Sequence, residues 1–136
     1  MKKLILIATV ILIAGNTSCQ PLQKGNFIGF HVLTVNLDPD VTMNQFYDLW
    51  KNKVVPEYEK NLECKFYSLK GIRGEYTNCI AGMLVWKTEA DRDKFFNKEG
   101  GNTEAGKAAF AKIQPALDQL AKLGTSTSKY TDWLVQ

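Results

Sequence analysis

The chain has 136 residues, of which 45% are hydrophobic and 23% are charged, and its formal net charge at pH 7 is +3. This composition is that of an ordinary globular chain with a modest hydrophobic core. Two of the three excess positive charges are Lys2 and Lys3, and the lack of a basic stripe excludes nucleic acid as an expected partner.

The first 18 residues have the layout of a secretory signal peptide. Lys2 and Lys3 precede an unbroken apolar run at residues 4–14, and small or polar residues then lead to Cys19. The apolar run is too short for a transmembrane helix, which needs about 20 apolar residues. We therefore expect residues 1–18 to be a signal peptide that takes no part in the fold.

Cys19 is the candidate lipidation site. The sequence Thr17-Ser18-Cys19 resembles a lipobox, in which the cysteine carries the lipid and becomes the mature N-terminus, although Asn16 replaces the aliphatic residue that this motif prefers. Acyl chains bury methylene groups at about 0.8 kcal/mol each, so several chains hold a protein firmly on a membrane. We expect a lipoprotein of the bacterial cell envelope, and Gln20 favours the outer membrane. The alternative is a secreted or periplasmic soluble protein.

The rest of the chain divides into a lipidated cysteine with a short polar tether at residues 19–25 and one domain at residues 26–136. The β-rich runs predict strands at residues 27–37, 64–73, 79–87 and 130–135. Apolar residues at helical spacing predict a helix from Thr42 that Pro56 kinks or locally breaks, a short helix after Thr88 and a longer helix from Thr103. This order, β-α-β-β-α-β, is the ferredoxin-like pattern of an α+β domain with a four-stranded antiparallel sheet.

One face of such a sheet is covered by the helices, and the other face needs a different cover. A second copy of the same sheet is a common solution, which predicts a homodimer that forms a dimeric α/β barrel. Alternation along the first strand places Gly29, His31, Leu33 and Val35 on one side, and Phe30, Val32 and Thr34 on the other. Both sets are apolar enough to be buried, so the sequence leaves open which set faces the helices.

Cys64 and Cys79 are expected to be unpaired thiols. They lie on the two arms of one predicted hairpin, with Cys79 close to the turn and Cys64 at the far end. Several residues at about 3.3 Å each separate them along the sheet, whereas a disulfide needs Cα atoms within about 7 Å. We therefore predict two free, buried thiols.

Residues 27–136 resemble the dimeric α/β-barrel superfamily. The segment His31-Val32-Leu33-Thr34-Val35 is similar to the first strand of the stress-responsive barrel domains. The segments YSLKGIRG at residues 67–74 and GMLVWKTEADRDKFF at residues 82–96 resemble small members of the same group, which also includes antibiotic-biosynthesis-monooxygenase-like domains. The superfamily contains oxygenases, isomerases, cyclases, haem-handling enzymes and non-catalytic domains, so the resemblance implies a fold rather than an activity.

His31 is the only histidine and the candidate catalytic residue. In a barrel its side chain would point into the cavity between the sheet and its partner, and act there as a general acid or base near neutral pH. The alternative is a partly buried histidine with a structural hydrogen bond. No partner carboxylate is identifiable near it in the sequence.

Five further residues are candidates for ligand binding. Lys70 and Arg73 lie near the predicted hairpin turn and would hold an anionic ligand, although charges at turns are commonly only solvated. Tyr67, Tyr76 and Trp86 would line an apolar pocket with polar handles, although such residues are more often core or dimer interface.

The sequence favours no metal and no cofactor. One histidine and no C-x-x-C pair make a zinc site improbable, and no Walker A or Rossmann glycine motif is present.

Three functions remain open. The first is an envelope-anchored domain that binds a small apolar or aromatic ligand in the cavity of a dimeric barrel. The alternative is a cofactor-independent monooxygenase- or isomerase-like enzyme that uses His31 as acid and base. The third is a structural module whose interior is filled with side chains.

Overall fold

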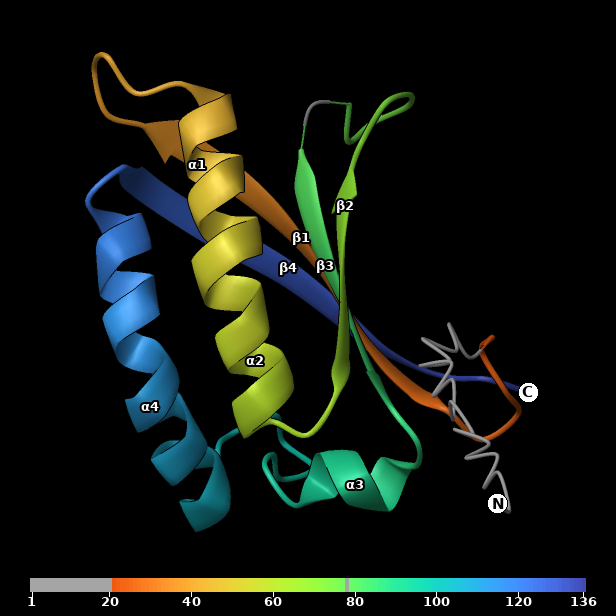
Figure 1. Ribbon diagram of the computed structural model, residues 1–136. Coiled ribbons are helices and arrows are strands. Elements are labelled where there is room, and N and C mark those ends of the chain that lie inside the picture. The colour runs from red at the N-terminus through yellow and green to blue at the C-terminus, as the bar shows by residue number, and fades with distance from the viewer. Residues whose placement is uncertain (1–20, 78) are drawn as a thin grey trace, which may run out of the picture.

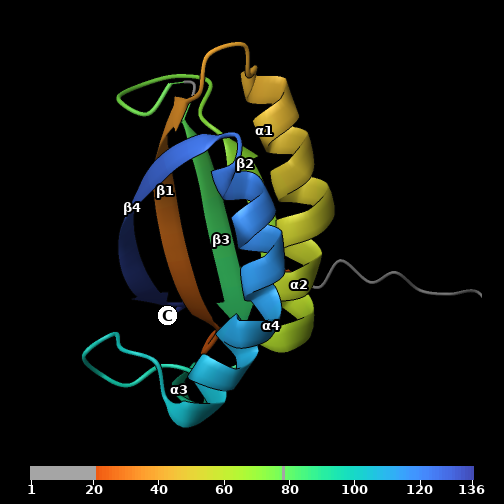
Figure 2. The same ribbon diagram turned by 90° about the vertical axis from the view of Figure 1, so that its left-hand side faces the viewer.

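The computed structural model describes residues 21–77 and 79–136, so the predicted signal peptide, Cys19 and Gln20 lie outside the described residues. Its elements are β1 (Phe27–Leu37), α1 (Met43–Leu49), η1 (Trp50–Val54), α2 (Val55–Asn61), β2 (Lys65–Lys70), β3 (Ile80–Trp86), α3 (Glu89–Asp93), α4 (Glu104–Ala121) and β4 (Gly124–Leu134). The four strands form one antiparallel sheet in the order β2-β3-β1-β4. In Figures 1 and 2 the helices α1, α2 and α4 cover one face of this sheet, while α3 lies at one end. The predicted ferredoxin-like α+β fold is therefore confirmed. Among the helices of the described segments, none is long and apolar enough to cross a membrane.

The first helical region is locally broken before Pro56, which is one of the two predicted outcomes. Thr42 caps α1 as expected, and its side chain and that of Gln45 form a capping box. A π-helical segment, η1, interrupts the α-helix between α1 and α2, and Pro56 stands in the first turn of α2. A proline ring collides with the carbonyl four residues earlier in a regular α-helix, and the wider π turn relieves that contact.

β4 is longer than predicted, because it begins at Gly124 rather than at Tyr130. Residues 125–129 are small or polar and look like a loop in the sequence. They are exposed in the structure and pair with β1 through the backbone from Asn36 to Val32. An edge strand of this kind has little need of an apolar side-chain pattern, since it packs against nothing on its outer side.

The hydrophobic core fills the space between the sheet and the helices. Its most completely buried large side chains come from the helical layer, the α2–β2 connection and β3: Phe46, Val54, Leu62, Ile80 and Ile113. α4 begins at the N-cap Thr103 and directs Ala109, Ala116 and Leu120 inward, as its spacing predicted. Thr88 caps α3, which also agrees with the sequence.

The register of the strands shows which residues face the helices. Leu33 of β1 lies in the core and pairs with Ile80, which is also buried there. His31 and Gly29 share that side, because side chains alternate along a strand. Phe30 lies on the opposite side, next to Met83 and, through it, Tyr67. That second side is the open face, and in the described part of the chain no helix covers it (Figure 2).

Cys64 and Cys79 are both free, as predicted. Cys64 is buried just before β2, whereas Cys79 is only half-buried just before β3. The β2–β3 pairing runs from Lys65 opposite Val85 to Lys70 opposite Ile80, so the two cysteines flank opposite ends of it. The predicted separation is confirmed, and the prediction that both thiols are fully buried is wrong for Cys79.

Candidate functional site

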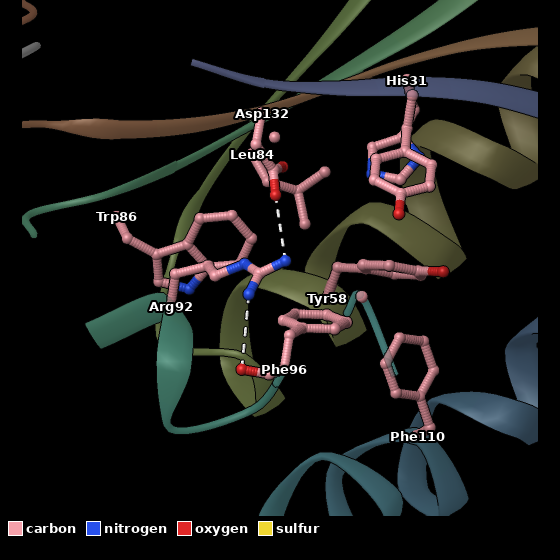
Figure 3. Close-up of a pocket in the computed structure, with 11 residues that line it drawn as sticks. His31, Tyr58, Leu84, Trp86, Arg92, Phe96, Phe110 and Asp132 are labelled. Carbon is pink, nitrogen blue, oxygen red and sulfur yellow. Dashed lines mark hydrogen bonds and ion pairs between the residues drawn. The ribbon is translucent and has the colours of Figure 1, made fainter. Parts of the chain in front are cut away.

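A cavity of about 130 Å³ lies between the sheet and the helical layer, at the end of the sheet where β1 begins and β3 ends (Figure 3). A cavity of about 150 Å³ lined by apolar side chains is large enough to bind benzene, so this space suits a single-ring molecule. The sheet contributes Gly29, His31, Leu84, Trp86, Tyr130 and Asp132 to its lining. The helices and the loop after α3 contribute Tyr58, Phe110, Arg92, Phe96 and Gly100.

Aromatic rings form one wall of this cavity. Phe96 makes edge contacts with Trp86 at a centroid distance of 6.0 Å and with Phe110 at 5.9 Å. Tyr58 meets Phe110 in the same way at 5.9 Å. The Nε1 of Trp86 donates to the carbonyl of Leu62 at 2.9 Å, so its polar group is satisfied away from the cavity. This edge-to-face network makes a rigid apolar wall.

Tyr58 stays protonated over the whole physiological range. Burial, with a smaller contribution from Cys64, raises the pKa of Tyr58 to about 12. Its hydroxyl is therefore neutral, and the ring acts as an apolar surface.

His31 presents a neutral imidazole to the cavity. Its Nδ1 lies 3.2 Å from the Oγ of Ser128, and its ring stacks on Tyr130 with centroids 5.5 Å apart. Burial lowers the pKa of His31 below 6.5, although the nearby Asp132 opposes this shift. At pH 7 the ring is uncharged, and it is able to accept or donate one hydrogen bond through each nitrogen according to its tautomer.

Arg92 is a buried cation at the floor of the cavity and is only 7% exposed. One nitrogen, Nη2, pairs with the Oδ2 of Asp132 at 2.9 Å, and the other, Nη1, pairs with the Oδ1 of Asp93 at 3.1 Å. Nη1 also donates to the carbonyl of Asn97 at 2.8 Å. The guanidinium lies over the ring of Phe96, 5.2 Å from its centroid. Arg92 thus ties α3 and the loop after it to the end of β4, as the dashed contacts in Figure 3 indicate in part.

The structure brings two of the predicted site residues, His31 and Trp86, to this cavity. The prediction that His31 faces a cavity between the sheet and a partner is wrong, because His31 lies on the side of β1 that faces the helices. Tyr67 lies on the open face, because it is paired with Met83, whose side chain points away from the helices, whereas Leu84 points toward them. Lys70 ends β2 at the other end of the sheet from the cavity, next to the hairpin that contains Arg73 and Tyr76 (Figure 1). A role in ligand binding for these four residues stays a prediction that the geometry of this cavity does not support.

Two charged residues of the cavity, Arg92 and Asp132, were not predicted from the sequence. Phe95 and Phe96 follow Arg92 at helical spacing, but α3 ends at Asp93, before either of them, so this spacing does not locate Arg92 in the site. Asp132 was inside the predicted last strand, but its position opposite Gly29 depends on a register that the sequence does not reveal.

No group of three or more His, Cys, Asp or Glu residues that would hold a metal ion is present within residues 21–77 and 79–136.

Comparison with known proteins identifies the fold. No family model matches the chain, and no curated protein matches it. A NIPSNAP family protein from Agrobacterium tumefaciens is similar in structure, with 13% identity over 86% of this chain and 91% of that one and a TM-score of 0.56. A NIPSNAP-like domain protein from Burkholderia xenovorans matches with 10% identity over 84% and 87% of the two chains and a TM-score of 0.51.

A more distant likeness is to SnoaB, a cofactor-independent oxygenase from Streptomyces nogalater. It has 14% identity to this chain over 82% of this chain and 94% of that one, with a TM-score of 0.46. The two NIPSNAP likenesses are strong enough to show a shared architecture, and identities of this size show nothing beyond it. The chain is therefore a ferredoxin-like α+β domain with the architecture of the NIPSNAP structures.

Proposed function

We propose that this domain binds a small apolar or aromatic molecule in the cavity between its sheet and its helices. The observation that carries the proposal is the lining, in which aromatic rings and Leu84 surround a space of about 130 Å³ with a few polar groups at one side. Ligand sites are typically apolar clefts with a small number of placed polar groups. The small volume favours a single ring over a drug-sized molecule.

A second candidate function is a cofactor-independent isomerase- or monooxygenase-like enzyme that uses His31. The observation that favours it is the neutral imidazole on the cavity wall, which is in the correct state to accept a proton near pH 7. Binding is preferred because Asp132, the carboxylate that acts on the pKa of His31, is hydrogen-bonded to Arg92 and not to the imidazole. The Nδ1 of His31 meets a serine hydroxyl instead of a carboxylate that would orient it.

Binding is tested with toluene as the probe and the indole N–H signals of tryptophan in NMR as the readout. The protein is the full chain expressed in a bacterium and purified from the envelope without refolding. Toluene is expected to shift the Trp86 signal at the cavity and to leave that of Trp133, which pairs with Ile28 on the open face, unchanged. A saturating probe that leaves Trp86 unmoved would contradict the proposal.

A matched pair of variants locates the site. Phe96→Ala removes an aromatic ring from the cavity wall, and Tyr67→Ala removes one from the open face. Aromatic contacts contribute about 0.5–1.5 kcal/mol each beyond their buried area, so Phe96→Ala is expected to lower the affinity for toluene severalfold. Tyr67→Ala is expected to change the affinity by less than that, and equal losses would place the site elsewhere.

We also propose that a second copy of the chain covers the open face. This face carries a continuous set of apolar or mostly apolar side chains from all four strands: Ile28, Phe30, Val32, Tyr67, Leu69, Ala81, Met83, Val85 and Trp133. Leu69 and Trp133 are 38% and 58% exposed in the single chain. Native mass spectrometry of the purified protein is expected to give a dimer, and a clean monomer would remove this proposal.

We also propose that a lipid on Cys19 anchors the protein to the bacterial cell envelope, with the outer membrane as the expected location. The support is the signal-peptide layout and the lipobox-like sequence before Cys19. Metabolic labelling with a fatty acid is expected to mark the protein and to fail for Cys19→Ala. Fractionation then separates an outer-membrane lipoprotein from a secreted or periplasmic soluble protein, and unlabelled wild-type protein would favour the soluble alternative.

A further inference from the structure

We propose that the cavity selects a ligand that carries a protonated amino group beside its ring, and that Asp132 is the residue that determines this selectivity. This inference rests on the proposed binding function and specifies its ligand class. It comes from three observations: the groups that converge beside Gly29, the charges around Arg92, and the aromatic wall.

Three side-chain groups converge beside Gly29, which has no side chain to cover them. A Cβ at this position would lie 3.5 Å from the Oδ1 of Asp132 and 3.8 Å from the Nε2 of His31. The same point lies 3.3 Å from the ring of Trp86. A ligand nitrogen on the cavity side of Gly29 would therefore approach a carboxylate oxygen, an imidazole nitrogen and the Trp86 ring.

The carboxylate of Asp132 has one oxygen available for such a ligand. Its Oδ2 accepts from Arg92 at 2.9 Å, whereas in the described part of the chain no hydrogen-bond donor reaches its Oδ1. Asp132 lines the cavity, and its Oδ1 is directed toward Gly29, another lining residue, so the free oxygen is within reach of a ligand there. A charged donor such as an ammonium makes the strongest hydrogen bond to a carboxylate oxygen.

The charges around this point favour a cation over an anion. Arg92 is paired with both Asp93 and Asp132, so one positive charge faces two negative charges. His31 adds no charge at pH 7, because burial lowers its pKa. A ligand with one positive charge would make the group neutral, whereas a carboxylate ligand would add a third negative charge.

The aromatic wall supplies a contact for the ring of the ligand. Aromatic rings attract one another in edge-to-face and offset-stacked arrangements. Trp86, Phe96 and Tyr58 line the same cavity as the free oxygen of Asp132 (Figure 3). The ring of the ligand would pack on this wall while its amino group reaches the space beside Gly29.

Four probes of similar size separate charge from shape: benzylamine, benzyl alcohol, ethylbenzene and benzoate. Each is titrated into the full-length protein at pH 7 with the Trp86 indole signal as readout. Benzylamine is expected to bind at least tenfold more tightly than ethylbenzene, because only benzylamine has an ammonium group that makes a charge-assisted hydrogen bond to Asp132. Benzyl alcohol is expected between these two, and benzoate is expected to bind most weakly.

Two variants with the same change of charge test the role of Asp132. Asp132→Asn keeps an oxygen for Arg92 but removes the carboxylate from the cavity, and it is expected to abolish the tenfold advantage of benzylamine over ethylbenzene. Asp93→Asn removes the other carboxylate on Arg92, which does not line the cavity. It is expected to leave most of that advantage. Equal losses in the two variants would overturn the assignment to Asp132.

Gly29→Ala provides a test that does not depend on the Arg92 ion pair. The added methyl group meets Trp86 at 3.3 Å and the other two groups at ordinary contact distances, so only a small shift of the ring is needed. It is expected to weaken benzylamine more than toluene, and equal weakening would contradict the proposed position of the amino group. If toluene shifts the Trp86 signal but benzylamine binds no more tightly than ethylbenzene, the proposed amine selectivity is wrong and the proposed binding function stands. If no probe shifts the Trp86 signal, the binding function and the amine selectivity are both wrong.

Discussion

The two faces of the sheet are built from the same strands, but between Phe27 and Leu33 of β1 only the helix-covered face contains a glycine and a polar residue. In the middle of that face, Leu33 and Ile80 lie side by side and pack into the core. At the end where β1 begins, Gly29, His31 and Asp132 occupy the equivalent positions. On the open face, β1 has no such interruption from Ile28 to Val32. The cavity thus arises from side-chain size and polarity on a regular backbone, and the open face stays apolar along the middle of β1 and β3, as a partner sheet would need.

The largest expected effect contrasts two neighbouring residues of β1 that point to opposite faces. Leu33→Ala is expected to lower the free energy of unfolding by about 2–5 kcal/mol, because it removes a buried side chain and leaves a void in the core. Val32→Ala, on the open face, removes partly buried methyl groups and is expected to cost about 1 kcal/mol. Urea unfolding followed by circular dichroism measures both.

Protein concentration sharpens this contrast. The loss for Leu33→Ala is expected to be the same at all protein concentrations, since the helices of the same chain cover Leu33. If a second copy covers the open face, the stability of the protein rises with concentration and Val32→Ala reduces that rise. A stability that is independent of concentration would contradict the dimer.

The second prediction compares two arginines. Arg92→Ala removes the buried partner of Asp132 and Asp93 and is expected to lower the free energy of unfolding by about 2–4 kcal/mol. This value is in the lower part of the range for breaking a buried ion pair, because both carboxylates are partly exposed to solvent. Arg73→Ala, in the exposed hairpin, is expected to stay within about 0.5 kcal/mol of the wild type. Thermal unfolding measures both variants, and equal effects would show that Arg92 does not hold the cavity floor.

The third prediction concerns pH and His31. Because burial lowers its pKa in the folded chain, the unfolded chain binds more protons once the pH falls below about 6.5. The folded state is therefore expected to lose stability as the pH falls from 6.5 toward the lower folded pKa, with no further loss from this group below it. His31→Gln has no titrating ring and is expected to show a shallower fall between pH 7 and pH 5 than the wild type. Identical slopes would mean that His31 is as well solvated in the folded chain as in the unfolded one.

The fold was accessible from the sequence because its signals are local. Apolar spacing located the helices, and the N-caps Thr42, Thr88 and Thr103 stand where they were expected. The start of β4 was missed because its first half is exposed at the sheet edge and has no apolar alternation to detect. The π-helical form of the break at η1 was not predicted, because a proline excludes one geometry without selecting the one that replaces it.

The site was less accessible because it depends on contacts between distant segments. His31 was found as the only histidine, and Trp86 as an aromatic residue of a central strand. Arg92 and Asp132 meet across 40 positions of sequence, and only the register of β4 on β1 brings them together. Tyr67 was grouped with Trp86 although alternation and pairing place it on the opposite face, which the sequence alone left open.

The smallest expected effect separates the two free thiols, one on the covered side of the sheet and one beside the hairpin. Burial, with a smaller contribution from Glu59, raises the pKa of Cys64 to about 12, so its thiol is neutral and unreactive at pH 8. Cys79 is half-buried and is expected to react first with a thiol reagent, while Cys64 reacts only when the chain unfolds. The measurement is the labelling rate of Cys64→Ser and Cys79→Ser with and without denaturant. Rapid labelling of Cys64 in the native Cys79→Ser protein would mean that α2 opens readily. The Sγ of Cys64 lies 3.9 Å from the carbonyl oxygen of Tyr58 in α2. Such opening would therefore contradict a rigid cavity wall at Tyr58.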